Sequence, residues 1–322
     1  MLSPKARKSL THVQTVPALS RTHLTTFLLT SKNVEPPKAP KSITLVHTVP
    51  LIILLLRFFI YFSFLRCQVE MDFYIVAHKY VIESNYASFT HEEKKRMLCW
   101  VFVNEAIPKI IPDWIPSESL IKEYELPVYD PLLQMNNFYQ NSFFIHLNRN
   151  RYLVKKGYVG FGQYDMTLPA NVFRQAEEII LKGVSTLFFM YPYPFEALYS
   201  NPLNEEVWRE LVDIYNTRTK TSHSFDQVKK VPLILCHTFI LPTSIFFECM
   251  DFVEASVPFC LKNLEWKTRH LAGTLERVIA LALSFKILEG RFQNLVHLQG
   301  IEHVAAQHAG DELRGLNPGL TS

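Results

Sequence analysis

The stretch from Lys155 to Pro169, KKGYVGFGQYDMTLP, predicts a buried strand that ends in a polar turn. An apolar run follows the two lysines, reaches Gly-Gln-Tyr-Asp, and is closed by the proline. Polar groups just beyond a buried strand are where α/β proteins often hold a metal or a substrate hydroxyl. Asp165 is therefore either a site residue or the ordinary polar end of a strand. We expect Thr167 or Asn171, rather than Asp165, to cap the next helix.

Strand and helix patterns alternate on both sides of this stretch. Short apolar runs predict strands at 73–77, 152–161, 184–192 and 231–242. Amphipathic or long apolar patterns predict helices at 90–103 with Thr90 as N-cap, at 171–183 closed by Gly183, at 204–219 with Asn204 as N-cap, at 242–265 and at 273–290. This alternation over most of the chain predicts an α/β fold, with a mainly parallel sheet flanked by helices.

Composition excludes several classes of protein. Apolar residues make up 48% of the 322 residues and charged residues 20%, which is enough for a large core. The chain has only 10 glycines, and neither the dinucleotide-binding glycine fingerprint nor the P-loop pattern occurs. A net charge of +3 gives no reason to expect nucleic acid as a partner. The 5 cysteines lack zinc-ligand spacing, so buried free thiols are expected.

The first 70 residues differ from the rest of the chain. Residues 1–42 carry seven Lys or Arg against the single acid Glu35 and are rich in Pro, Ser and Thr, so we expect a disordered basic segment. Residues 43–66 form the most apolar window and are long enough for one membrane-spanning helix. Arg57 near its centre costs about 2.5–3.5 kcal/mol on insertion scales, and Pro50 lies in its first turns.

This window allows three interpretations. As a signal anchor it makes the protein a single-pass type II membrane protein, in the Golgi or endoplasmic reticulum of a eukaryote, with the C-terminal part outside the cytosol. In the second, the leader is artefactual or processed; if Met71 is the true start, the protein is cytoplasmic or peripheral. A buried or interfacial helix is the third alternative. In each of these interpretations we expect residues 71–298 to form the catalytic domain and the polar residues 299–322 to form a flexible tail.

Polar groups occur at the ends of several predicted strands. His78 and Lys79 follow the first strand, Gln163, Tyr164 and Asp165 follow the second, and His237 interrupts the fourth. A lone histidine in an apolar strand is more often a hydrogen-bonded core residue than a ligand. Since functional groups gather at the carboxyl ends of parallel strands, these residues are nevertheless candidates for one shared site.

The segment RHLAGTLER, residues 269–277, places charged groups at the start of an apolar helix. Glu276 and Arg277 share a face with Gly273. One interpretation is an internal ion pair or an exposed first turn, because buried charges need partners. The other is functional, with Glu276 as a general base and Arg277 as a cation for phosphates.

Five short motifs occur together in an order that resembles a known family. They are FYIVAHK (73–79), VGFGQYDM (159–166), GVSTLFFMYPYPFEALYSN (183–201), CHTFILPTSIFFECMDF (236–252) and GTLERVIALAL (273–283). Their order resembles that of capsular-polysaccharide and exopolysaccharide glycosyltransferases, a family first catalogued as a domain of unknown function. The resemblance covers roughly residues 71–290 and implies a GT-A-like, Rossmann-like fold.

The resemblance implies a nucleotide-sugar donor, a glycan or polysaccharide acceptor and a role in polysaccharide biosynthesis. It implies Glu276 as a catalytic residue, and the strand-end position of Asp165 within the ordered motifs makes Asp165 the second catalytic candidate. The residues that it implies in donor binding are His78, Lys79, Gln163, Tyr164 and Arg277. The family has Gly-Leu-x-His-Tyr-Arg-Arg where this chain has Gln163-Tyr164-Asp165-Met166, so two cations are lost and an acid is gained. That acid could hold Mn²⁺ or Mg²⁺, with His237 as a further ligand.

Two other functions stay open on the sequence alone. The same scaffold could be a nucleotide-sugar hydrolase or a phosphotransferase. It could instead be a catalytically inactive, membrane-anchored binding or scaffold protein, which the loss of the two cations favours.

Overall fold

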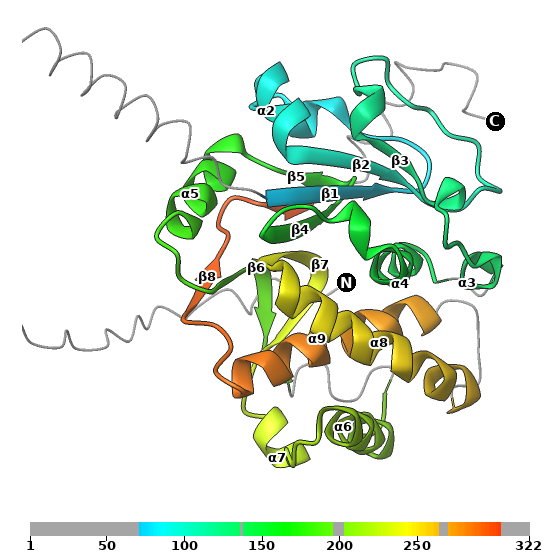
Figure 1. The fold of residues 1–322 in the computed structure, drawn as a ribbon, viewed down its shortest axis with the longest axis vertical. Coiled ribbons are helices and arrows are strands. Elements are labelled where there is room, and N and C mark those ends of the chain that lie inside the picture. The colour runs from blue at the N-terminus through cyan, green and yellow to red at the C-terminus, as the bar shows by residue number, and fades with distance from the viewer. Residues whose placement is uncertain (1–70, 136–137, 196–202, 264–269, 304–322) are drawn as a thin grey trace, which may run out of the picture. The chain divides into compact units, whose positions relative to one another are not determined.

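The computed structural model describes residues 71–135, 138–195, 203–263 and 270–303 (Figure 1). The predicted basic segment 1–42, the predicted membrane anchor 43–66 and most of the predicted tail 299–322 lie outside these residues. Within the described ranges, no helix is both long enough and apolar enough to span a membrane. The anchor at 43–66 stays a prediction.

A seven-stranded sheet in the order β3-β2-β1-β4-β7-β6-β8 forms the centre of the fold. Strand β1 pairs in parallel with β2 and with β4, whereas β7 runs antiparallel to both of its neighbours, β4 and β6. The strands are β1 (Met71–Ala77), β2 (Leu98–Phe102), β3 (Leu120–Lys122), β4 (Tyr158–Gln163), β6 (Thr186–Tyr193), β7 (Leu233–Pro242) and β8 (Asn294–His297). The mainly parallel sheet confirms the predicted α/β class and is consistent with a GT-A-like arrangement.

Helices cover both faces of this sheet (Figure 1). They are α2 (His91–Met97), α3 (Pro131–Met135), α4 (Asn141–Arg149), α5 (Ala170–Ile180), α6 (Glu205–Thr219), α7 (Phe225–Val228), α8 (Thr243–Asn263) and α9 (His270–Leu288). Short 3₁₀ turns are η2 (Glu83–Tyr86), η3 (Ser117–Ser119), η4 (Glu123–Glu125) and η5 (Arg151–Leu153).

Strand β1 contributes to two cores because its side chains alternate. Tyr74 and Val76 join the core under α4, α6, α8 and α9, while Phe73 and Ile75 join the core under α2 and α5. Every residue of β1 is buried. This explains why its sequence is continuously apolar, as strands covered on both faces are.

Two of the predicted helix caps are confirmed. The Thr90 hydroxyl accepts from the backbone N–H of Glu93 at 3.2 Å, and the Asn204 side chain accepts from that of Val207 at 2.9 Å. Each satisfies a backbone donor that the first helical turn leaves open.

The predicted helix at 90–103 and the predicted caps of α5 are wrong in part. Helix α2 ends at Met97, and the residues from Leu98 to Phe102 form strand β2, which pairs with β1. The apolar run is aromatic and β-branched, so it suits a buried strand as well as a helix. Pro169 precedes the first residue of α5 without a side-chain cap, so neither Thr167 nor Asn171 serves as one.

A second sheet joins two distant parts of the chain. Strand β5 (Met166–Thr167) directly follows Asp165 and pairs antiparallel with β9 (Glu302–His303). Leu298 and Ile301, which lead into β9, are buried in the same core as β5. The pairing with β9, among the last described residues, therefore stabilises the turn that carries Asp165.

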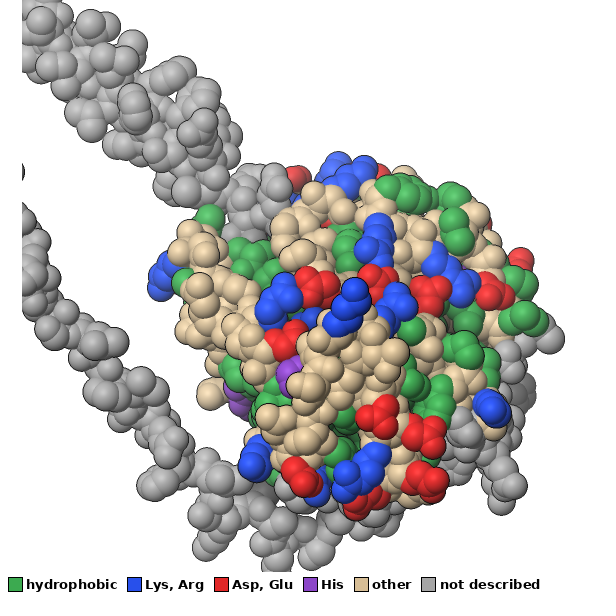
Figure 2. Space-filling view, turned by 60° about the horizontal axis from the view of Figure 1, so that its bottom comes forward, with side chains coloured by type: hydrophobic (Ala, Val, Ile, Leu, Met, Phe, Trp, Pro, Cys, Tyr) green, Lys and Arg blue, Asp and Glu red, His purple; other side chains and the backbone are tan. Residues whose placement is uncertain are grey.

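One face of the molecule carries both signs of charge. Figure 2 shows Lys and Arg side chains interleaved with Asp and Glu across the centre of this view, without an extended patch of one sign. Charges are also interleaved in bridged groups: Arg149 contacts Asp130 at 3.2 Å and Glu254 at 2.8 Å. Such groups cancel locally and produce little long-range field.

Candidate functional site

The carboxyl ends of β1 and β4 meet because these strands are parallel neighbours. Val76 of β1 lies opposite Gln163, the last residue of β4, and the backbone N–H of Tyr164 donates to the carbonyl of Val76 at 3.2 Å. The structure therefore brings together the predicted residues that follow these two strands, which are His78, Lys79, Gln163, Tyr164 and Asp165.

Asp165 lies in the turn between β4 and β5, among phenol rings. The rings of Tyr80 and Tyr164 meet edge to face with centroids 5.3 Å apart. Burial, followed by the nearby Asp165 carboxylate, raises the pKa of Tyr164 to about 12. The same two causes raise the pKa of Tyr80. The Asp165 carboxylate disfavours further negative charge on both neighbouring phenols, so a cation is favoured over a phosphate at this point.

Strand β7 is distorted where it passes this corner. Cys236 and His237 have φ angles of 63° and 48°, and the register between β6 and β7 shifts between Phe189 and Tyr191. Non-glycine residues in this left-handed region cost about 1–3 kcal/mol each and persist only where their surroundings hold them. Strain of this kind gathers at functional sites.

Two side chains from other elements hold the distorted backbone of Cys236. Its N–H donates to Oε1 of Glu276 at 2.7 Å, and its carbonyl accepts from Nε2 of Gln163 at 3.1 Å. Cys236 thereby links β4, β7 and α9. Burial, with Glu276 and Asp165 nearby, raises the pKa of its thiol to about 12. The thiol stays protonated at neutral pH and is not a nucleophile.

His237 is buried, with 4% of its surface exposed, and its ring packs against Phe144 at a centroid distance of 5.0 Å. Its Nδ1 lies 3.5 Å from Nε2 of Gln140, whose Oε1 lies 3.3 Å from Nε2 of His78. Burial lowers the pKa of both histidines. Both imidazoles are therefore neutral at pH 7. Gln140 connects two predicted residues, although no sequence pattern points to it.

Glu276 and Arg277 occupy the first half of α9. Nη1 of Arg277 donates to the carbonyl of Gly273 at 2.7 Å, and its buried Nε has no hydrogen-bond partner among the described residues. Burial lowers the pKa of Arg277, while the neighbouring Glu276 carboxylate acts in the opposite direction. Neither residue forms an ion pair with another described side chain, so the internal ion pair considered above is not found there.

Asp165 is better suited to a divalent cation than His237. Among residues 71–303, leaving out the undescribed gaps, no group of three or more His, Cys, Asp or Glu side chains could hold a metal ion. Mg²⁺ is often held by only one or two carboxylates together with phosphate oxygens and water. We expect the Asp165 carboxylate, rather than a larger cluster, to be the ligand for such an ion. His237 fits it less well, because its ring is buried and its Nδ1 faces Gln140.

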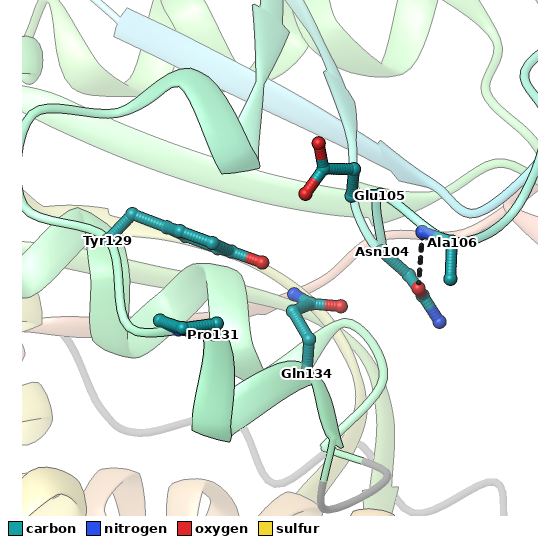
Figure 3. Close-up of a pocket in the computed structure, with 6 residues that line it drawn as sticks. All are labelled: Asn104, Glu105, Ala106, Tyr129, Pro131 and Gln134. Carbon is teal, nitrogen blue, oxygen red and sulfur yellow. Dashed lines mark hydrogen bonds between the residues drawn. The ribbon is translucent and has the colours of Figure 1, made fainter.

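A pocket of about 480 Å³ opens at the carboxyl end of β2, one strand away from β1 (Figure 3). None of its residues belongs to the predicted site. Its lining consists of Asn104, Glu105, Ala106, Tyr129, Pro131 and Gln134.

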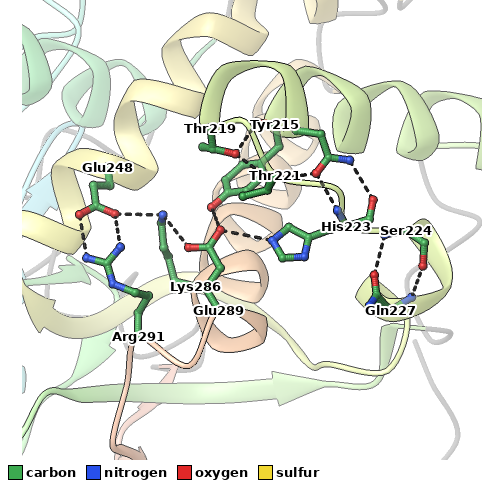
Figure 4. A network of polar contacts seen from close by, with 11 residues as sticks. Tyr215, Thr219, Thr221, His223, Ser224, Gln227, Glu248, Lys286, Glu289 and Arg291 are labelled. Carbon is green, nitrogen blue, oxygen red and sulfur yellow. Dashed lines mark hydrogen bonds and ion pairs between the residues drawn. The ribbon is translucent and has the colours of Figure 1, made fainter.

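A polar network on the other side of the fold joins α6, α8 and α9 (Figure 4). The ammonium of Lys286, whose residue is only 4% exposed, lies 3.0 Å from carboxylate oxygens of both Glu248 and Glu289. Arg291 also binds Glu248, and Tyr215 donates to Glu289. Although burial alone would raise it, hydrogen bonds from Tyr215 and Lys286 lower the pKa of Glu289. These contacts tie helices together, and no predicted site residue takes part.

Comparisons with known proteins add little to this geometry. No family model matches the sequence. No curated protein matches it either. Among solved structures, the chain is similar to the apo structure of the WbbM bifunctional glycosyltransferase, with 9% sequence identity and a TM-score of 0.49. The match covers 73% of this chain and 45% of that one, so this chain spans less than half of that protein's length. A likeness this weak supports no conclusion about activity.

Proposed function

We propose that this protein is a nucleotide-sugar-dependent glycosyltransferase that acts on a glycan or polysaccharide acceptor. One observation supports this most: two predicted site residues, Glu276 and Gln163, hold the strained residue Cys236. Oε1 of Glu276 accepts from its N–H at 2.7 Å, and Nε2 of Gln163 donates to its carbonyl at 3.1 Å. Asp165 follows Gln163 closely in the chain, so two carboxylates and two neutral histidines gather at the edge of the sheet where α/β proteins bind ligands.

In the proposed reaction, the acceptor hydroxyl attacks the anomeric carbon of the donor sugar. A carboxylate oxygen of Glu276 takes the hydroxyl proton as the new C–O bond forms. The bond from the anomeric carbon to the diphosphate breaks, and the diphosphate leaves with the electron pair. Lys79 and Arg277 are the cations proposed to meet that charge. A divalent cation held by Asp165, if present, would neutralise the same leaving group.

The proposed donor contacts rest on position. His78, Gln163 and Tyr164 follow the two central strands, where the diphosphate and its sugar would lie across the sheet edge. His78 is neutral and can donate or accept a hydrogen bond without adding charge. The ammonium of Lys79 forms no ion pair among the described residues, so it is available to an anionic ligand.

The alternative, a binding or scaffold protein without catalytic activity, is favoured by one contact. Nη1 of Arg277 donates to a carbonyl of its own helix, so part of the guanidinium is already engaged. In this interpretation, Glu276 serves only to hold the bend in β7. A nucleotide-sugar hydrolase differs from the transferase only in using water as acceptor.

The first test is a thermal-shift screen of the full-length protein against UDP-, GDP-, CMP- and dTDP-sugars, each with and without Mn²⁺. A donor present at about 100 times its dissociation constant stabilises the fold by about 2.7 kcal/mol. A shift that requires Mn²⁺ and disappears in Asp165→Asn supports the cation role of Asp165. The matched control is Asp113→Asn, at an exposed loop position.

Turnover separates the enzymes from the scaffold. Release of nucleotide only in the presence of a glycan acceptor supports the transferase, and release into water supports the hydrolase. A folded protein that gives no shift with any donor overturns the proposed function and leaves the scaffold as the better account.

A further inference from the structure

The pocket at the carboxyl end of β2 lies beside the candidate site. Its first residue, Asn104, follows β2 closely, and the backbone N–H of Val103 donates to the carbonyl of Ala77 at 3.0 Å. Ala77 is the last residue of β1 and precedes His78. The pocket therefore opens on the same edge of the sheet, where α/β proteins bind their ligands.

A buried carboxylate fixes one wall of the pocket. Glu123 is fully buried, and Nδ1 of His146 donates to its Oε1 at 2.7 Å. Nε2 of His146 accepts from the backbone N–H of Asp130 at 2.9 Å, so the ring is neutral and its tautomer is set. The Gln134 amide nitrogen donates to the other oxygen of Glu123 and to the Ser142 hydroxyl. Both of its hydrogens are thus used, which leaves Oε1 of Gln134 as an acceptor.

Tyr129 supplies a rigid ring and a hydrogen-bond donor. Its ring packs against that of His146 with centroids 4.9 Å apart. Burial, followed by the charges of Glu123, Glu105 and Asp130, raises the pKa of Tyr129 to about 12, so the hydroxyl keeps its proton. Figure 3 shows the Tyr129 hydroxyl, the Gln134 amide and the Glu105 carboxylate turned toward the same space.

The opposite wall is a turn that internal hydrogen bonds hold in place. Asn104 has a φ of 63°, and its side-chain oxygen accepts from the backbone N–H of Ala106 at 3.2 Å. The Lys109 ammonium donates to the carbonyls of Asn104 and Ile107. Glu105 is exposed and forms no ion pair with a described side chain, so its carboxylate is open to a ligand.

The charges of this lining identify the class of ligand. Glu105 carries the only charge among the lining side chains, and the Lys109 ammonium, which binds the carbonyl of the lining residue Asn104, is committed to carbonyl oxygens. A phosphate would meet a carboxylate without a compensating cation, which disfavours it. Two acceptors, one donor and the faces of Tyr129 and Pro131 match instead a ring that carries several hydroxyls.

We propose that this pocket binds the hydroxyl-bearing ring of a sugar, with Glu105 and Gln134 as acceptors and Tyr129 as donor. The inference deepens the proposed function and rests on it. The ring has two possible sources, the ribose of the nucleotide-sugar donor or a sugar unit of the acceptor. Both present vicinal hydroxyls, so the same side chains serve either, and the probes below distinguish them.

The test is saturation-transfer NMR on the full-length protein. The probes are uridine, cytidine, guanosine and adenosine, their 2′-deoxy counterparts, methyl glycosides of glucose, galactose and mannose, and inorganic phosphate. At least one hydroxylated probe is expected to bind. Because hydrogen bonds to a charged group are the strong ones, Glu105→Ala should reduce the affinity for that probe by about 10- to 100-fold. Tyr129→Phe should weaken it less, and Glu92→Gln, exposed on α2, should leave it unchanged.

Each outcome decides something. Binding of a ribonucleoside, with weaker binding of its 2′-deoxy form and loss in Glu105→Ala, supports the pocket with ribose as the source. Binding of a methyl glycoside with the same loss supports the acceptor. The proposal is overturned if no probe binds, if Glu105→Ala binds like the parent protein, or if inorganic phosphate binds as well as the sugars.

The pocket and the proposed function can fail separately. If a probe binds only when Glu105 is present but the protein turns over no donor, the pocket proposal stands and the transferase proposal fails. If Glu105→Ala transfers sugar at the parent rate and with the parent KM values, the transferase proposal stands and the pocket proposal fails. Melting curves of each variant confirm folding, which the exposed position of Glu105 makes easy to preserve.

Discussion

Two substitutions separate the two roles of Glu276, as the proposed base and as the hydrogen-bond acceptor that holds Cys236. Its Oε1 holds the N–H of Cys236 at 2.7 Å, and its charge is the proposed base. Glu276→Gln keeps an acceptor oxygen but removes the charge, so the bend in β7 should persist at a cost of about 1 kcal/mol. The proposed proton transfer is lost, and the turnover rate should fall by about 10²–10⁴-fold.

Glu276→Ala removes both roles. The Cys236 N–H then lacks its partner, which costs about 1–3 kcal/mol, and the left-handed residues lose one of the bonds that hold them. The assays are urea denaturation for the free energy of unfolding and the initial rate of nucleotide release with acceptor. Glu178→Gln, at an exposed position of α5, is the control. Transfer at the parent rate in Glu276→Gln would refute the base, and an alanine variant as stable as the parent would refute the holding role.

Two further predictions concern stability. The lowered pKa of Glu289 means that its contribution is present above the unfolded-state pKa of about 4.3 and is lost as pH falls through the folded-state value. Lys286→Met should reduce stability by about 1–3 kcal/mol at pH 7, because buried carboxylate oxygens lose a hydrogen-bond donor. It should also flatten the acid side of a plot of melting temperature against pH, and an unchanged acid side would contradict this. Gly160→Ala would place a methyl group against the Phe73 ring and should cost about 1–3 kcal/mol in urea denaturation. The control is Gly157→Ala, which meets no atom within 4 Å, and equal stability of the two variants would refute the packing argument.

The sequence predicts the class of fold well because β1, β4 and β7 are buried and apolar, with helices between them. It misplaces the boundary at Met97, where a charged helix passes directly into a strand. A single apolar run from Leu98 to Val103 has no period that separates these two structures. Packing beside β1 decides the outcome, and that contact is not visible locally.

Only part of the candidate site is predictable from the sequence. Strand ends point to Asp165 and His78, and an unusual charge in an apolar helix points to Glu276. The sequence gives no warning of positive φ angles at Cys236 and His237, since neither is glycine. It also passes over Gln140 and Glu123, because an amide and a lone acid in irregular segments carry no pattern. Their importance comes from tertiary contacts alone.

The pairing of β5 with β9 has a consequence for how the protein is made. The turn that carries Asp165 is translated near the middle of the chain, but its partner strand, at Glu302–His303, leaves the ribosome much later. Strands β1, β2 and β4 are all translated before that partner, although domains generally fold as units. The turn itself is closed only when the last described residues arrive. A prematurely terminated chain would therefore lack the strand that pairs with this turn.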